Sequence, residues 1–250
     1  EMWGGDTLIA PYLKAGMNAG FNFGLWFDIR KSLEEGNDHM VNNLFSCYDH
    51  YQENNSTFTD AIFLSNHDNP RIMDEVGGNM DKAKLAAHIL FTLPYTPYVY
   101  YGDELGMFGP KPDEHIREPF LWGLKNPFNC KWEPNFHNAR TKSLLQQQGD
   151  PNSLYSTYKK LIALRNRSEA LSEGRMKRSP VNQPGLLSWM RSTGESNLIV
   201  IHNLQPVASR INLASLPGAG QWTIEYKSSS AISLHDQILE IPAYGTVLVK

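Results

Sequence analysis

Residues Ala61–Asp68 read Ala-Ile-Phe-Leu-Ser-Asn-His-Asp, and this stretch decides the fold of the first part of the 250-residue chain. Its first four residues form a continuous apolar run of strand length. The polar cluster Asn66-His67-Asp68 follows directly on that strand. In barrels of alternating strands and helices, polar residues at the C-terminal ends of strands line the active site. The alternative is an ordinary turn, because Asn, Asp and Pro all favour turns.

Strands and helices alternate on both sides of this stretch. Apolar residues recur at helical spacing after Asp38 and again after Asp81, and Pro94 ends the second helix. Residues 21–25 and 97–102 read as further buried strands. The alternation predicts parallel strands joined by right-handed crossovers.

The chain changes character beyond residue 102. Residues 103–150 are rich in Pro, Gly, Asn and Trp and show no long period, and irregular stretches of this length are usually functional or disordered. Asp150-Pro151 then supplies good N-cap and first-turn chemistry for a helix. After Gly174 the apolar period switches to two, which predicts a small antiparallel sheet or sandwich. The expected strands are 186–191, 197–203, 209–213, 221–226, 238–241 and 245–250. We therefore predict two domains, residues 1–174 and residues 175–250.

Composition and charge exclude several classes of partner. The chain is 41% hydrophobic and 20% charged, with a formal net charge of −3. It offers no basic surface, so we expect no nucleic acid partner. No apolar run approaches the roughly 18 residues of a membrane span, so we expect no membrane partner. The aspartates Asp28, Asp38 and Asp103 do not have the spacing of a calcium loop.

Four segments, in their order along the chain, resemble motifs of the α-amylase family of glycoside hydrolases. Glu1–Trp3 (EMW) is similar to the family's fifth-strand segment, and Phe63–Asp68 (FLSNHD) to the motif on its seventh strand. Tyr98–Met107 (YVYYGDELGM) resembles its eighth strand and following loop, and Arg117–Trp122 (REPFLW) its Arg-x-Pro-x-x-Trp loop. The final strands, which end in Pro242–Gly245 (PAYG), resemble its C-terminal β-domain.

The resemblance implies a fold of class α/β plus all-β. We expect the later half of a (β/α)8 TIM barrel, about strands 5–8, followed by a small antiparallel β-sandwich domain. It also implies catalytic roles for two residues. By its position, Glu1 resembles the general acid that protonates the leaving oxygen and later acts as base toward water. Asp68 resembles the carboxylate that holds sugar hydroxyls and stabilises the oxocarbenium-like transition state.

The same resemblance implies a set of substrate-binding residues, for which structural roles remain open. His67 matches the imidazole that binds a sugar hydroxyl, and Asn66 belongs to the same motif. Arg71 either reaches Asp68 or a sugar, or ties down the loop after strand 61–64. Arg117 resembles a substrate-side arginine, with a structural ion pair to a neighbouring glutamate as the alternative. Trp3 stacks on a sugar face or is a packed aromatic.

The family's nucleophile has no counterpart in this sequence. The family carries it on the fourth strand, upstream of the acid, and nothing in residues 1–250 matches that segment. Retaining glycosidases need a nucleophile and an acid roughly 5–5.5 Å apart. We therefore expect the chain to be an incomplete fragment that begins on its own catalytic acid and does not complete hydrolysis alone. A half-barrel would expose an apolar face and two edge strands, so we also expect it to associate with a missing N-terminal half of the barrel or with a second copy.

The implied activity is retaining hydrolysis of α-glucosidic bonds in starch, another α-glucan or a maltooligosaccharide. The alternatives are an α-glucosidase or transglycosylase of the same family, or a noncatalytic carbohydrate-binding fragment. Members of the family often carry calcium, which is an option for the full-length protein, but we assign no metal and no cofactor. Enzymes that digest external starch are exported and those acting on internal maltodextrins are cytoplasmic; an extracellular or periplasmic location is the expectation.

Overall fold

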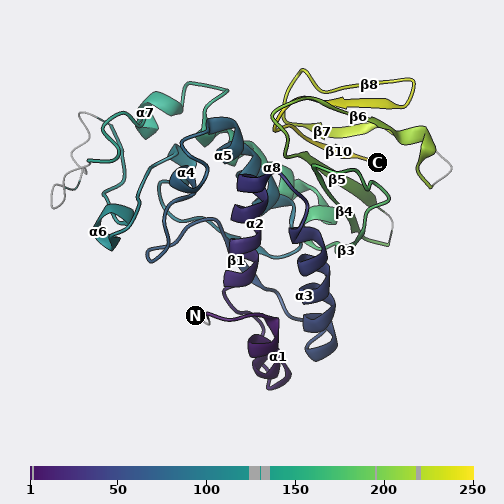
Figure 1. Ribbon diagram of the computed structural model, residues 1–250, viewed down its shortest axis with the longest axis horizontal. Coiled ribbons are helices and arrows are strands. Elements are labelled where there is room, and N and C mark those ends of the chain that lie inside the picture. Colours follow the sequence, from purple (N-terminus) through teal and green to yellow (C-terminus); the bar gives the residue numbers. More distant parts are fainter. Residues whose placement is uncertain (2, 124–129, 131–135, 195, 218–220) are drawn as a thin grey trace.

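The structure is a computed structural model that describes residues 1–250 except 2, 124–129, 131–135, 195 and 218–220. The first part of the chain holds helices and a short parallel pair of strands, and antiparallel sheets form the last part (Figure 1). The helices are α1 Asp6–Lys14, α2 Phe23–Glu35, α3 Met40–Asn54, α4 Ile72–Glu75, α5 Met80–Thr92, α6 Asp113–Ile116, α7 Leu144–Gln147, α8 Leu154–Arg167 and α9 Glu169–Ser172. Within the described residues, no helix has the length and apolar character needed to cross a bilayer.

The parallel pair positions the loops that follow it. Strand β1, Ala61–Phe63, pairs with β2, Thr96–Tyr98, in parallel and in register from Ala61 opposite Thr96. A single parallel bridge joins Phe21 to Ala61 on the other side of β1. This confirms the predicted parallel strands, which α4 and α5 separate in the chain. The C-terminal end of β1 leads directly into Asn66-His67-Asp68.

Several predicted element bounds were wrong. The strand expected at 97–102 ends at Tyr98, and the strand expected at 221–226 begins at Ile224. The expected strand at 21–25 is a strand only at Phe21, because α2 begins at Phe23. Asn22 is its N-cap, and its side-chain oxygen accepts a hydrogen bond from the Leu25 N–H at 2.8 Å, which favours helix over strand. Helix α8 begins after Ser153 rather than at Asp150-Pro151, because Ser153 Oγ accepts from the backbone N–H of Ser156.

The last part of the chain holds two antiparallel sheets. A five-stranded sheet has the order β3-β4-β5-β10-β7, and a three-stranded sheet has the order β6-β9-β8. The strands are β3 Arg175–Arg178, β4 Leu186–Ser192, β5 Asn197–Asn203, β6 Ser209–Asn212, β7 Ile224–Lys227, β8 Ser233–His235, β9 Ile238–Ile241 and β10 Thr246–Val249. The sequence prediction missed β3 and β8. Both are edge strands, and edge strands carry polar residues that hide the apolar period.

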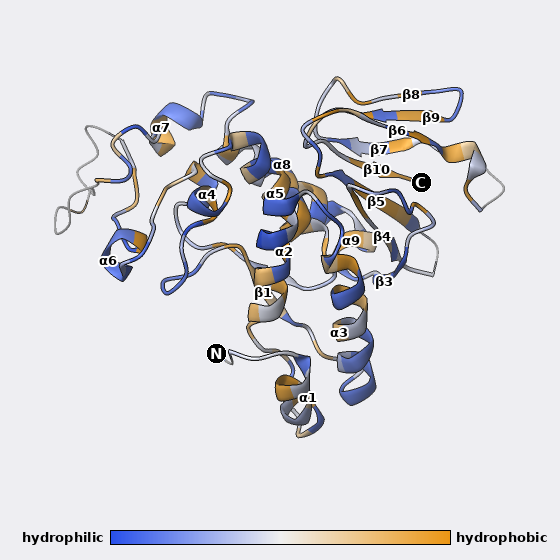
Figure 2. Cartoon of the chain, viewed as in Figure 1, coloured by the Kyte–Doolittle hydropathy of each residue, from blue (hydrophilic) through white to orange (hydrophobic). Residues whose placement is uncertain are grey.

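The five-stranded sheet is buried on both faces. On β5, Leu198 and Val200 belong to the core shared with the helices, whereas Ile199 and Ile201 face the core between the two sheets. Figure 2 shows β5 and β10 as apolar strands, in orange. One continuous core therefore joins the sheet to the helical part of the chain.

Candidate active site

The loop after β1 is held by its own side chains. Asn66 Oδ1 accepts hydrogen bonds from the backbone N–H groups of Asp68 at 2.9 Å and Asn69 at 2.7 Å. Ser65 Oγ accepts from the N–H of Ile72 at 2.9 Å. Side-chain acceptance of this kind is how Asn and Ser shape turns. The Asn66 oxygen thus fixes the backbone that presents His67 and Asp68.

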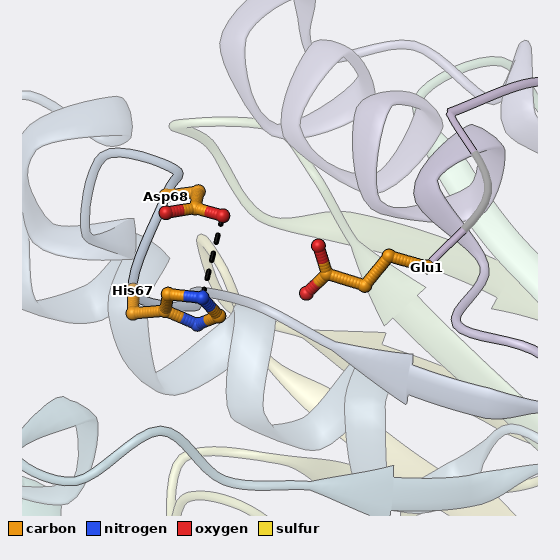
Figure 3. Close-up of side chains that lie close together, drawn as sticks. All are labelled: Glu1, His67 and Asp68. Atoms are coloured by element: carbon orange, nitrogen blue, oxygen red, sulfur yellow. Dashed lines mark ion pairs between the residues drawn. The ribbon is translucent and has the colours of Figure 1, made fainter.

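Glu1, His67 and Asp68 lie together, as Figure 3 shows. Their ligand atoms are all within 4.8 Å of one another. His67 Nε2 is 3.3 Å from Asp68 Oδ2, and the Glu1 carboxylate points at this pair from the start of the chain. The His67 side chain is 55% exposed and that of Asp68 32%, so a ligand has access to both. Two carboxylates and an imidazole can transfer protons and hold sugar hydroxyls.

Arg117 is the fourth member of this group. It follows α6 as its C-cap residue. Its Nη2 donates to Asp68 Oδ1 at 2.9 Å and to Asp113 Oδ2 at 3.0 Å, and its Nε donates to the carbonyl oxygen of His67 at 3.0 Å. The guanidinium therefore contacts both residues at the tip of the loop after β1.

The glutamates next to Arg117 do not pair with it in the described part of the chain. Glu118 is buried and accepts from the His137 backbone N–H and the Asn138 side chain. Glu114 is exposed on α6. The structural ion pair of Arg117 is formed with Asp113 instead.

Arg71 has no exposed surface. It donates to the carbonyl oxygens of Tyr101 at 2.7 Å and Ile116 at 3.0 Å, and its Nη1 is 3.5 Å from Asp103 Oδ1. Burial raises the pKa of Asp103 to about 7, against the opposing effect of the Arg71 charge. A fully buried guanidinium cannot reach a sugar, so these contacts support the second role considered for Arg71, as a tie between loops.

Trp3 packs against the first residue of α2. Its ring stacks on that of Phe23, with centroids 4.1 Å apart, and it is 59% exposed. One aromatic face is used by Phe23, and sugar stacking by Trp3 remains a prediction. Trp132, another tryptophan in the loop region, lies outside the described residues.

Glu1, His67 and Asp68 form a group of possible metal ligands within the described residues. Calcium takes six to eight oxygen ligands, whereas this cluster offers two carboxylates and an exposed imidazole. Asp103, an aspartate considered from sequence, is buried against Arg71. These residues therefore do not fit calcium.

The sequence of this chain matches two protein-family models. Residues 1–174 match the protein-family model described as alpha amylase, catalytic domain, and residues 186–248 match the alpha-amylase SusG C-terminal domain. The chain belongs to the α-amylase family. The domain boundary at residue 174 stays a prediction.

Individual α-amylases agree with this membership. Alpha-amylase 3 of Dictyoglomus thermophilum is 37% identical over 260 residues, which cover 100% of this chain and 50% of that protein. Alpha-amylase SusG of Bacteroides thetaiotaomicron is 34% identical over 216 residues, 82% of this chain and 31% of that protein. The crystal structure of an α-amylase from H. orenii superposes with a TM-score of 0.90 at 31% identity, covering 99% of this chain and 52% of that one.

The chain thus spans about half the length of the first α-amylase it matches, and less of the second. The predicted fold class is confirmed as part of an α-amylase catalytic domain followed by an antiparallel C-terminal domain.

Asp113 is the site residue that sequence reasoning missed. Its spacing of four residues from Arg117 on α6 is a pairing signal that could have found it.

Proposed function

We propose that this α-amylase family chain takes part in retaining hydrolysis of α-glucosidic bonds in starch or maltooligosaccharides. The observation that carries the proposal is the convergence of Glu1, His67 and Asp68 within 4.8 Å at the end of a parallel strand. In this proposal Glu1, His67 and Asp68 have the roles expected from sequence. Glu1 gives its proton to the glycosidic oxygen and then takes one from water, while Asp68 and His67 hold the sugar hydroxyls.

We further propose that residues 1–250 alone do not turn over substrate. Double displacement needs a carboxylate nucleophile opposite the acid. In this proposal Asp68 binds sugar hydroxyls and is not the nucleophile. It is paired with Arg117, and no segment of the sequence resembles the nucleophile strand. The nucleophile would then come from protein outside these residues.

The names of the relatives with higher sequence identity support a preference for α-glucan substrates. Two of them, at 37% and 34%, carry the name α-amylase, whereas three named as oligo-1,6-glucosidases are 24–27% identical. This favours α-glucan chains over short α-glucosides. An α-glucosidase, a transglycosylase and a noncatalytic carbohydrate-binding fragment are the other outcomes of the test.

The test uses residues 1–250 and the longest native polypeptide that contains them. Reducing-end release is measured on starch, maltotetraose, isomaltose and nitrophenyl α-glucoside, and the first anomer formed is recorded by NMR. We expect the long form to act on starch and maltotetraose and to release the α-anomer. Residues 1–250 alone should show no turnover above that of their Glu1→Gln variant.

In the long form we expect Glu1→Gln to lower kcat by about 10²–10⁴-fold, because general acid–base catalysis contributes that much. Glu114→Gln, on the exposed side of α6, is the control and should keep full activity. A long form that hydrolyses starch equally well with Gln at position 1 would contradict the role of Glu1. Turnover by residues 1–250 that Glu1→Gln abolishes would contradict the need for an outside nucleophile.

A further inference from the structure

A groove of about 640 Å³ lies between the helices α5 and α8 and the C-terminal sheets. Its walls come from α5, from residues 151–160 around the start of α8, from residues 226–230 at the end of β7 and from the turn 242–245 between β9 and β10 (Figure 1). The described lining contains none of the residues of the candidate active site. Small-molecule pockets have volumes of roughly 300–1,000 Å³, so this cavity, the α5–β7 groove, is large enough for a ligand.

We propose that the α5–β7 groove binds a short neutral oligosaccharide, as a second sugar site apart from the candidate active site. The inference rests on the proposed function for the identity of the sugar, which is then an α-glucan. A glucan chain held there keeps the enzyme on its substrate without occupying the site of cleavage.

His88 and Tyr226 give the groove a hydrogen-bond acceptor. His88 Nδ1 lies 2.7 Å from the carbonyl oxygen of Lys84, which can only accept, so Nδ1 carries the ring proton. Burial lowers the pKa of His88 to about 4, so the ring is neutral and Nε2 accepts from the Tyr226 hydroxyl at 3.0 Å. That hydroxyl gives its only proton to His88, and its lone pairs can accept from a ligand.

Serine hydroxyls beside β7 give the groove donors. Ser228 Oγ accepts from the backbone N–H of Thr246 at 2.9 Å, and Ser229 Oγ accepts from that of Ala231 at 3.2 Å. Because each oxygen acts as an acceptor toward the backbone, each hydroxyl can donate its proton to a ligand. The groove therefore presents donors and acceptors together.

Charged side chains also line the groove. They are Lys84, Lys160 and Lys227, with Asp81 as the one carboxylate among the described lining residues. The ammonium groups by themselves would attract an anion. A phosphate group offers chiefly acceptor oxygens, however, and these would face the Tyr226 oxygen and the Asp81 carboxylate. A sugar hydroxyl both donates and accepts, so it can satisfy every group in this lining.

Rings supply the apolar part of the lining. They belong to Pro151, Pro242, Tyr226 and Tyr244. Flat apolar faces of this kind pack against the faces of sugar rings. Tyr244 has a φ of 55°, which residues other than glycine rarely adopt, and such strain concentrates at binding sites. The turn 242–245, for which the candidate active site gives no role, thus gains one in the groove.

The test uses the longest native polypeptide that contains residues 1–250, with Glu1→Gln to prevent cleavage. Maltohexaose is titrated into this protein by calorimetry, and into versions that also carry Tyr226→Phe or Lys160→Ala. We expect a binding event beside the one at the candidate active site. Each added change should weaken that event by about 5- to 10-fold, since one hydrogen bond contributes about that much.

Lys159→Ala is the matched control, because it removes an exposed neighbouring lysine of α8 that does not line the groove. It should leave both binding events unchanged. Lys160→Ala should also keep the wild-type melting temperature, because the Lys160 side chain is exposed. With Glu1 restored, Lys160→Ala should leave kcat on maltotetraose unchanged, whereas retention on insoluble starch should fall.

A crystal structure with maltohexaose locates the sugar directly. Sugar found only at the candidate active site, or binding that neither Tyr226→Phe nor Lys160→Ala weakens, would overturn the proposal. Inorganic phosphate that displaces maltohexaose from the groove would also overturn it, because the site would then be an anion site. If the groove binds maltohexaose and the protein with Glu1 hydrolyses none, the proposed function fails and the second sugar site stands.

Discussion

At the scale of single residues, two buried arginines complete the end of α5. The last carbonyl groups of a helix have no partners within it. Arg165 donates to the carbonyl oxygens of Phe91 at 2.9 Å and Leu93 at 2.8 Å, and Arg191 donates to that of Thr92 at 2.9 Å. Burial lowers the pKa of Arg165 to about 10 and that of Arg191 to about 9, so both remain charged at neutral pH.

Arg191 also joins β4 to the end of α9, through the carbonyl oxygens of Leu171 and Gly174. Arg191→Met should lower the free energy of unfolding by about 3 kcal/mol, because several buried acceptors lose their donor at once. Urea denaturation measures this loss. Arg210→Met is the control, since that side chain is 70% exposed in its pair with Glu240 and should change stability by less than about 0.5 kcal/mol. Equal effects of the two changes would contradict the capping role.

At the scale of elements, α5 is joined to the five-stranded sheet by buried polar side chains. His88 Nδ1 contacts the Lys84 carbonyl at 2.7 Å, and its Nε2 contacts the hydroxyl of Tyr226 on β7 at 3.0 Å. Thr92 Oγ1 lies 3.2 Å from Nε2 of His202 on β5. Burial lowers the pKa of His88 to about 4 and holds that of His202 well below its usual value. Both imidazoles are therefore neutral when this interface is formed.

The depressed pKa of His88 predicts acid sensitivity of this interface. Between the unfolded value of 6.5 and the folded value of about 4, only the unfolded state binds the proton, so stability falls as pH falls. Relative to His88→Gln, the wild type should lose about 1.4 kcal/mol per pH unit in this window. Denaturant unfolding of both proteins at several pH values measures the difference.

Comparison with a variant is needed because two other buried groups titrate with the opposite sign. Burial raises the pKa values of Asp60 and Asp103 to about 7, and these groups favour the folded state as pH falls. They are present in both proteins and cancel in the difference. Tyr226→Phe removes the hydroxyl and keeps the imidazole, so it should retain the wild-type slope. An identical slope for wild type and His88→Gln would contradict the prediction.

Element boundaries also show where a sequence is ambiguous. The spacing of apolar residues in 21–25 fits a strand or the first turn of a buried helix equally well. Asn22 decides for the helix, because its side chain accepts from the Leu25 N–H. Helices α3 and α5 were predicted correctly. Their apolar residues keep helical spacing over several turns, which a strand cannot match.

At the scale of the whole molecule, the parallel pair has an open side. In the described part of the chain, β2 pairs with β1 and with no other strand. Tyr98 is 48% exposed, Val99 41% and Tyr101 38%. Parallel strands are normally paired with further strands and covered on both faces. The unpaired edge of β2 and the exposed side chains that follow it are therefore unusual. We propose that it is covered by the rest of a barrel or by a second copy.

Purified residues 1–250 should therefore associate in solution. Light scattering after gel filtration should give a mass above 28.3 kDa that rises with concentration. Val99→Lys should weaken association, because a charge at this surface opposes its burial. Val207→Lys, which alters a residue that is 63% exposed near the C-terminal sheets, is the control. A monodisperse monomer at all concentrations would contradict the proposal.

By itself, the sequence determined the family, the order of α/β and antiparallel regions, and the loop that carries His67 and Asp68. Local spacing and short motifs are sufficient for these, because they depend on residues close together in the chain. Only the tertiary structure showed the burial and the contacts of the arginines. Arg71 and Arg117 both lie next to turn residues, so they look alike in sequence. In the structure Arg71 is fully buried, whereas Arg117 donates a hydrogen bond to Asp68. Asp103 and Asp68, the carboxylates that Arg71 and Arg117 approach across the fold, lie more than 30 residues from them, beyond the reach of any local pattern.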